Sequence, residues 1–177
     1  MPLIFYILQL LCPSQYSGMG VEAPVKPVES FYSSGNTVVA FKTEIDYRRA
    51  VECLSLSMYH EARSKEEGRV GMLLTGLVIL NRVRHNDYQN DICSVVKAKN
   101  AFSWYSDGKS DRPKEQDRYR LAETMAKQLI EGKHSGKLPP NITFFKTCDS
   151  YSEFFTKLRF YKQYKSHCFY HHPRKKK

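Results

Sequence analysis

The sequence predicts a mainly α domain, of the α+β kind with a minor β part. Apolar residues recur at helical spacing over residues 46–63, 64–83 and 113–131, whereas the chain beyond residue 132 is aromatic and basic and is typical of extended segments and turns. The length of 177 residues favours one domain, and a hydrophobic content of 41% is enough for a core and too high for general disorder. We therefore expect a single helical domain completed by short extended segments.

The chain divides into three parts. Residues 1–42 combine an apolar run at 3–12 with a linker rich in Pro, Gly and Ser, residues 43–172 hold the periodic segments of the domain, and residues 173–177 form a basic tail. The apolar run is shorter than the roughly 20 residues that a spanning helix needs, and it lacks the basic residues and the cleavage site of a complete secretory signal. It either directs the chain to a membrane or packs on the domain.

The first two predicted helices carry most of the apolar residues. Those of the first helix lie on one face: Ala50, Val51, Leu54, Met58 and Ala62. Ser64 followed by Glu67 has the spacing of a capping box, so we expect the second helix to start at Ser64. That helix is apolar as far as Val83 and forms the axis of the core. Gly71 and Gly76 within it lower helix propensity, but they would let a neighbouring helix approach closely.

Three further segments complete the helical part. Asp91 is placed to cap a short helix, and residues 101–112 form a loop rich in Ser, Asp and Gly. A long amphipathic helix is predicted from Pro113 to Glu131. Pro113 then lies in its first turn and Gly132 follows its end, an asymmetry usual for helices.

One carboxylate occupies an unusual place near the end of the first helix. Glu61 lies three residues past Met58, beside the apolar face and close to the helix C-terminus. The helix dipole and partial burial there both oppose a negative charge, so they favour the protonated form that a general acid needs near neutral pH. The alternative is that Glu61 only holds helices together by pairing with Arg63, Arg82 or Arg84.

Five blocks of sequence follow one another in a characteristic order. The first is CLSLSMYHEARS at 53–64, and the second joins Glu67-Gly68 to VILNRV at 78–83. YQNDICSVV at 88–96 comes next, then FSW at 102–104 with Asp107-Gly108 after it, and SHCFY at 166–170 closes the series. In this order, over roughly residues 48–172, the chain resembles the SleB-type cell wall hydrolases, a family of spore-germination and phage lytic enzymes.

The resemblance implies a lysozyme-like, lytic-transglycosylase-like single domain. It implies cleavage of the β-1,4 glycan strand of peptidoglycan between N-acetylmuramic acid and N-acetylglucosamine, with one essential Glu at the position of Glu61. That residue would protonate the glycosidic oxygen and then act as base on the sugar's own C6 hydroxyl, which closes an anhydro ring. We expect a phage endolysin that acts in host lysis. The alternative is a noncatalytic basic module that binds cell-wall glycan or another polyanion.

A second catalytic carboxylate is hard to nominate. Ordinary hydrolysis by a muramidase or glucosaminidase usually needs two acids. Asp107, Asp111, Asp149 and Glu153 are available, but each lies in an expected turn or helix cap, where carboxylates are routine. This favours the mechanism with a single Glu.

Ser103 and Trp104 are the best candidates for substrate contacts, with Phe102 beside them. An exposed aromatic ring next to a hydroxyl suits a saccharide surface, although the one Trp of this chain would equally fill the core. Tyr151 and His167 are placed to line the same cleft, and the alternative for His167 is a structural hydrogen bond. Asn81 is expected to tie the second helix to a neighbouring loop rather than to touch substrate.

No metal or other cofactor is expected. The His-Glu pair at 60–61 is not part of an H-E-x-x-H arrangement, and the five cysteines contain no C-x-x-C pair. Cys53 and Cys93 are expected as buried thiols. A disulfide between Cys148 and Cys168 stays open, because it would require an oxidising compartment.

The net charge of +10 indicates affinity for a polyanion. Lys and Arg alternate with acids along the domain and form no single stripe, so no nucleic acid partner is expected. We expect a monomer whose substrate is peptidoglycan and whose basic surface and tail hold it near anionic envelope polymers. It would act in the periplasm or cell wall, reached through a holin from the host cytoplasm or by a weak N-terminal signal.

Overall fold

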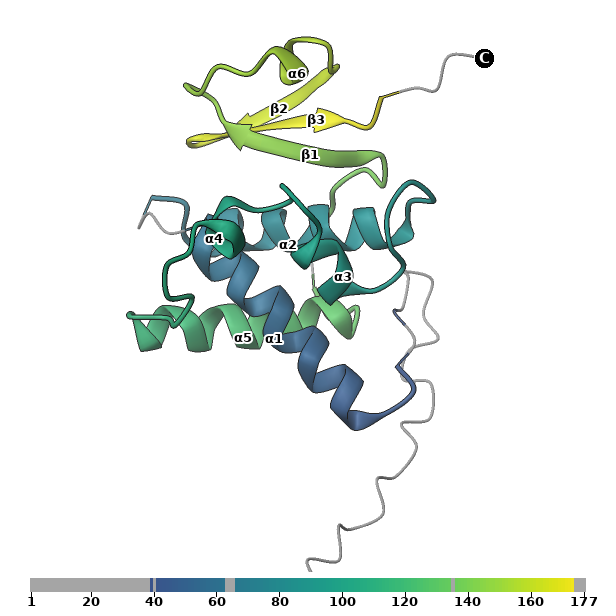
Figure 1. Cartoon of the computed structure of the whole chain (residues 1–177), viewed down its shortest axis with the longest axis vertical. Coiled ribbons are helices and arrows are strands. Elements are labelled where there is room, and N and C mark those ends of the chain that lie inside the picture. Colours follow the sequence, from purple (N-terminus) through teal and green to yellow (C-terminus); the bar gives the residue numbers. More distant parts are fainter. Residues whose placement is uncertain (1–38, 40, 63–65, 135, 174–177) are drawn as a thin grey trace, which may run out of the picture.

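The computed structural model describes residues 39, 41–62, 66–134 and 136–173, and Figure 1 shows their arrangement. About half of these residues form helices: α1 (Glu44–Glu61), α2 (Gly68–Arg84), α3 (Ile92–Lys97), α4 (Ser103–Ser106), α5 (Gln116–Ile130) and α6 (Glu153–Thr156). The strands are β1 (Ile142–Thr147), β2 (Phe160–Tyr164) and β3 (His167–His171). The expectation of a mainly helical domain with a minor β part is therefore confirmed. The N-terminal apolar run and the basic residues 174–177 lie outside the described residues.

The second helix separates the sheet from the other long helices. In Figure 1 the sheet lies on one side of α2, whereas α1 and α5 lie on the other. The contacts agree, because α1 packs on both α5 and α2 while α2 packs on β1. Leu54 and Met58 of α1 and Val78 and Ile79 of α2 are fully buried in this core. No helix of the described part is long and apolar enough to cross a membrane.

The beginning of α1 follows from local capping. The side chain of Thr43 accepts a hydrogen bond from the backbone N–H of Asp46 at 3.1 Å, which satisfies one of the free donors of the first turn. Glu44 and Asp46 place negative charge at the positive end of the helix dipole. The helix ends at Glu61, two residues before the predicted end.

The expected start of α2 was wrong. The helix begins at Gly68, which has a φ of +54°, and the side chain of Glu67 makes no capping hydrogen bond. Glu67 instead accepts hydrogen bonds from the backbone N–H and the hydroxyl of Ser166, at 2.9 and 2.5 Å. A buried carboxylate needs several donors, and a partner far along the chain supplies them here. Ser64, the other half of the expected capping box, lies outside the described residues.

The two glycines of α2 serve different purposes. A Cβ at Gly76 would lie 2.4 Å from the Cδ1 of Leu129 and 3.0 Å from the Sδ of Met58, so this glycine lets α5 and α1 approach, as expected. A Cβ at Gly71 would instead lie 2.7 Å from both the Cβ and the Oε2 of Glu67. Gly71 therefore makes room for a side chain of its own helix terminus, not for a neighbouring helix.

The later helices begin close to the predicted places. Asp91 caps α3 by accepting a hydrogen bond from the N–H of Ser94 at 2.8 Å, and Gly132, with a φ of +64°, follows the end of α5. However, α5 starts at Gln116, so Pro113 precedes the helix and is not in its first turn. Glu115, with φ −98° and ψ 91°, is the non-helical residue before the helix, and the hydroxyl of Tyr59 accepts hydrogen bonds from the N–H groups of residues 114 and 115 at 3.1 and 3.2 Å. The predicted loop 101–112 also contains α4.

The sheet is antiparallel, with the strand order β1-β3-β2. Two side chains of α2 attach it to the helices. The amide of Asn81 donates to the carbonyls of Pro139 and Ile142 at 2.8 and 2.9 Å, which confirms the expected tie to a neighbouring loop. The Nε of Arg82 donates to the carbonyl of Thr143 at 2.7 Å. These bonds fix β1 against the last turn of α2.

Four of the five cysteines form disulfides. Cys53 of α1 bonds Cys93 of α3, which corrects the expectation of two buried thiols, and Cys148 bonds Cys168. Helical spacing places Cys53 on an apolar face, but it cannot reveal that α3 brings a second sulfur to the same place. In the loop-closure picture, bridges spanning 40 and 20 residues contribute about 4 and about 3 kcal/mol of stability.

Candidate active site

Glu61 is the last residue of α1 and is half-buried. The chain leaves the helix at Ala62, which is fully buried, and the N–H of Ala62 still donates to the carbonyl of Met58 at 3.2 Å. The carbonyl of Ala62 accepts a hydrogen bond from the Nη2 of Arg118 in α5. The backbone that presents Glu61 is therefore held by two helices.

A buried guanidinium acts on Glu61 from α2. Arg82 is buried, and its Cζ lies 5.3, 5.7 and 5.8 Å from the ring centres of Phe102, Tyr88 and Phe144. Burial lowers the pKa of Arg82, while electrostatic interactions with Tyr88 and then Glu61 raise it, and the net effect is a lowered pKa. Arg82 and Glu61 therefore interact electrostatically between α2 and the end of α1.

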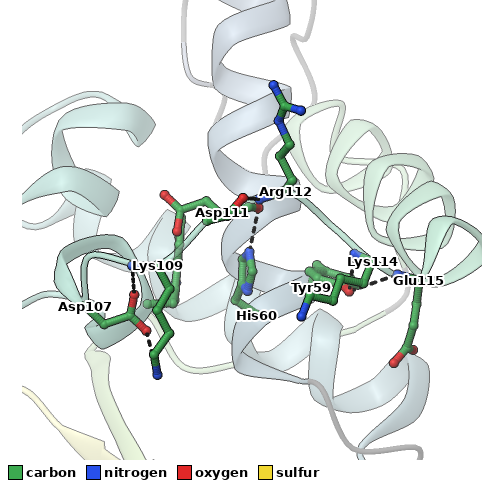
Figure 2. A pocket seen from close by; sticks show the side chains of 10 residues that line it. Tyr59, His60, Asp107, Lys109, Asp111, Arg112, Lys114 and Glu115 are labelled. Atoms are coloured by element: carbon green, nitrogen blue, oxygen red, sulfur yellow. Dashed lines mark hydrogen bonds and ion pairs between the residues drawn. The ribbon is translucent and has the colours of Figure 1, made fainter.

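A pocket of about 430 Å³ opens beside the end of α1 (Figure 2). Its walls are the last turn of α1, the Trp of α4 and the segment that leads to α5: Tyr59, His60, Trp104, Asp107, Lys109, Ser110, Asp111, Arg112, Lys114 and Glu115. Glu61 is not among these lining residues, although it follows two of them in the chain. The pocket therefore adjoins the helix end that carries Glu61.

His60 and Trp104 stack in the wall of this pocket. Their ring centres are 4.7 Å apart with an interplanar angle of 15°, and a ring nitrogen of His60 lies 3.0 Å from the carbonyl oxygen of Asp111. Trp104 is only 7% exposed and belongs to the core. This agrees with the alternative that the Trp fills the core. No sequence pattern indicates that His60 stacks on Trp104, because the contact depends on where α4 packs.

The other predicted substrate contacts are distributed over the molecule. Ser103 is exposed at the start of α4, and Phe102 is buried below the guanidinium of Arg82. Tyr151 is 85% exposed and lines a separate groove of about 340 Å³ on the sheet. His167 is buried, with its Nδ1 3.1 Å from the Oε2 of Glu67. The structure therefore brings Trp104 to the pocket and neither Tyr151 nor His167.

The acids weighed as a second catalytic group also separate into two regions. Asp107 and Asp111 line the pocket. Asp149 lines the groove on the sheet, and Glu153 forms an ion pair of 2.7 Å with Lys157 across one turn of α6. Only the first two are near the end of α1.

Glu67 is a buried acid whose partners the sequence did not reveal. Burial raises the pKa of its carboxyl, but hydrogen bonds from Ser166 and His167 and the charge of His167 lower it more, so the net pKa lies below the ordinary value. Gly71 has no side chain and so leaves the space that the Glu67 carboxylate occupies. No local sequence pattern points to the partner Ser166, which lies 99 residues away. This acid is held ionised and joins α2 to β3.

One group of side chains in the described residues lies close enough together to share a metal ion. It consists of His85, Asp87 and His172, beyond the C-terminal end of α2, and it shares no residue with the lining of the pocket.

Comparison with known proteins identifies the family. A family model described as Cell Wall Hydrolase matches residues 66–170, which is more than half of the chain. The match begins five residues after Glu61, so it includes the blocks of α2, α4 and β3 but not the segment that carries this acid. Comparison with curated proteins and with solved structures finds no match to the chain. The matched blocks and their order establish that the chain belongs to the SleB-type cell wall hydrolase family, whose members act on peptidoglycan.

Proposed function

We propose that this protein cleaves the β-1,4 glycan strand of peptidoglycan between N-acetylmuramic acid and N-acetylglucosamine, as a lytic transglycosylase with Glu61 as its single acid and base. The observation that carries the proposal is the position of Glu61: a half-buried carboxylate at the end of α1, in the field of the buried Arg82 and next to a pocket of about 430 Å³. Membership of the family supplies the substrate class.

The reaction needs two proton transfers, one from Glu61 and one to it. Protonated Glu61 gives its proton to the glycosidic oxygen while the bond to the anomeric carbon breaks through an oxocarbenium-like state. The resulting carboxylate then takes the proton of the C6 hydroxyl, and the C6 oxygen bonds to the anomeric carbon to close the anhydro ring. Glu61 is again protonated and no water is consumed. The helix C-terminus favours the acid form for the first step, and Arg82 favours the anion that the second step requires.

Substrate contacts follow from the placement of the predicted residues. The exposed hydroxyl of Ser103 is proposed to contact the sugar, while Phe102 and Trp104 shape the buried wall behind it. Tyr151, on the sheet, would contact a more distant part of the glycan strand. We assign His167 to the Glu67 contact and not to substrate, because it is buried there.

The cellular role is proposed as that of a phage endolysin with a lysozyme-like domain that acts in the periplasm or cell wall. Two disulfides support a site of action in an oxidising compartment, since cytosolic thiols are kept reduced. The basic surface, with its net charge of +10, would hold the enzyme near anionic envelope polymers.

The first test removes the acid. Glu61→Gln keeps the size and polarity of the side chain, so we expect the fold to persist and the clearing of chloroform-permeabilised Gram-negative cells to slow by about 10²–10⁴-fold. Glu52→Gln, at an exposed position of the same helix, is the matched control and should clear cells at the normal rate. Full activity of Glu61→Gln would refute the mechanism.

The second test identifies the chemistry. Mass spectrometry of the soluble fragments distinguishes anhydro-muramyl ends from reducing ends that have gained water. Anhydro ends support the transglycosylase, whereas reducing ends would indicate hydrolysis and turn attention to Asp107 and Asp111 in the pocket. If the wild-type protein binds purified sacculi but releases no fragments, the noncatalytic alternative applies.

A further inference from the structure

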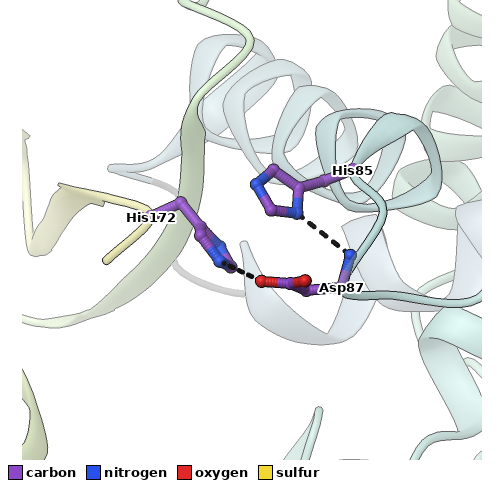
Figure 3. Close-up of side chains that lie close together, drawn as sticks. All are labelled: His85, Asp87 and His172. Atoms are coloured by element: carbon purple, nitrogen blue, oxygen red, sulfur yellow. Dashed lines mark hydrogen bonds and ion pairs between the residues drawn. The ribbon is translucent and has the colours of Figure 1, made fainter. Parts of the chain in front are cut away.

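A histidine–carboxylate–histidine cluster lies where α2 ends (Figure 3). His85 follows the last residue of α2, Asp87 lies two residues further on, and His172 follows the last residue of β3. One ligand atom from each residue lies within 4.8 Å of the others, and the Nε2 of His172 is 3.0 Å from an Oδ of Asp87. Figure 3 shows both rings and the carboxylate facing a common space.

The donor set has a definite chemical preference. Two imidazoles and one carboxylate are the ligands that Zn²⁺ uses in open sites, and related divalent transition ions accept the same set. Mg²⁺ and Ca²⁺ favour sites built of oxygen ligands. The rings of His85 and His172 have centres 3.8 Å apart, and one ligand atom from each of the three residues lies within 4.8 Å of the others.

Hydrogen bonds orient both rings. The Nδ1 of His172 lies 3.0 Å from the hydroxyl of Thr143, which leaves the Nε2 toward Asp87. A ligating histidine commonly has its other ring nitrogen held in this way. The Nδ1 of His85 accepts a hydrogen bond of 3.2 Å from the N–H of Asp87, so its lone pair is directed toward the Asp87 turn.

The surroundings allow a cation to enter. The side chains of His172 and Asp87 are 13% and 31% exposed, so the cluster is partly open to solvent. The nearest buried cation described here, Arg82, is screened from the cluster by Tyr88 and Phe144, whose rings contact both its guanidinium and the ring of His172.

We propose that His85, Asp87 and His172 form a binding site for one divalent transition-metal ion, with Zn²⁺ as the best fit. Three protein ligands leave a position for water, and the ion would join the end of α2 to the segment after β3. In the structure the three residues are already joined by the hydrogen bonds between His172 and Asp87 and between Asp87 and His85, and by the packing of the two imidazole rings. The proposal does not depend on the proposed function.

The test is a titration of the full chain, made without a histidine tag and freed of metal with a chelator. We expect one equivalent of Zn²⁺ to bind and to raise Tm by about 5 °C or more at an excess of ion. One equivalent of Co²⁺ should give the visible absorption of a site with nitrogen and oxygen ligands. Failure of the wild-type protein to bind either ion would overturn the proposal.

Variants locate the site. His85→Gln removes a ligand at a turn and keeps both side chains of the Asp87–His172 hydrogen bond, and it should weaken Zn²⁺ binding at least tenfold and abolish the rise in Tm. His172→Ala should do the same, with the fold checked by circular dichroism. His134→Ala, at a histidine outside the cluster, is the matched control and should bind as the wild type does. If His85→Gln binds Zn²⁺ with unchanged affinity, the ion lies elsewhere and the assignment is wrong.

Discussion

Two histidine–carboxylate contacts join α2 to the two ends of β3, and they differ mainly in burial. Glu67 precedes the first residue of α2 and meets His167 at the first residue of β3, 3.1 Å away. Asp87 comes just after α2 and meets His172 just after β3, 3.0 Å away. The side chains of the first pair are 2% and 7% exposed, whereas those of the second are 31% and 13% exposed.

The difference in burial gives the two histidine–carboxylate contacts different roles. In the buried pair, Ser166 adds two more hydrogen bonds to the carboxylate, so the site is filled and serves stability. In the more open pair, water competes with the contact, which therefore contributes little, but a second imidazole is within reach and solvent can deliver an ion. A filled polar cluster is structural, and an open one is available to a ligand.

Removal of each carboxylate should show the contrast most strongly. Glu67→Ala leaves a buried histidine and a serine without their acceptor, and we expect the free energy of unfolding to fall by about 3 kcal/mol. In metal-free protein, Asp87→Ala should lower it by about 0.5 kcal/mol, as for exposed ion pairs. Urea unfolding measures both, and equal losses from the two variants would contradict the comparison.

A substitution beside Glu67 tests how closely that site is packed. Gly71→Ala places a Cβ 2.7 Å from the Cβ and Oε2 of Glu67, so the carboxylate must move. Alanine gains helix propensity, but the displacement costs more, and we expect a net loss of about 1–2 kcal/mol. Val70→Ala, at the exposed preceding position, is the control without the clash and should change the free energy of unfolding little. A Gly71→Ala protein as stable as the control would show that Glu67 is loosely held.

The smallest expected effect is a dependence on pH. The folded pKa of Glu67 is lowered from its ordinary value of 4.5, because hydrogen bonds from Ser166 and His167 outweigh burial. A lowered folded pKa stabilises the protein above pH 4.5, and this contribution is lost as the pH falls through 4.5 toward the folded pKa. The difference in unfolding free energy between the wild type and Glu67→Gln should therefore narrow from pH 6 to pH 3. A difference that stays constant over this range would show that folding does not lower the pKa of Glu67.

Local patterns predicted the helical part well because helices depend on neighbours in sequence. The apolar spacing of α1 and α2, the Asp91 cap and the Gly132 terminus act within one or two turns, so the sequence contains the whole signal. The errors arose where a distant group competed. The hydroxyl of Tyr59 binds the segment just before α5, and Ser166 draws Glu67 away from the expected capping box.

The candidate site was predicted only in part for the same reason. Ordered motifs identified the family, and the helix pattern placed Glu61 at a helix end beside the core. The stacking of His60 on Trp104 and the field of Arg82 at Glu61 join residues from different helices, and periodicity contains no information on how those helices cross.

By itself, the sequence determined the helical class of this protein, its family and the one acid on which the proposed chemistry rests. Tertiary structure decided which side chains meet: Cys53 with Cys93, Glu67 with His167, and His85 and Asp87 with a histidine 85 residues beyond the aspartate. The physical reason is that helix formation is governed by interactions within a few residues, whereas these contacts exist only after separate elements have packed together: α3 on α1 for the cysteines, and the sheet on α2 for the other two.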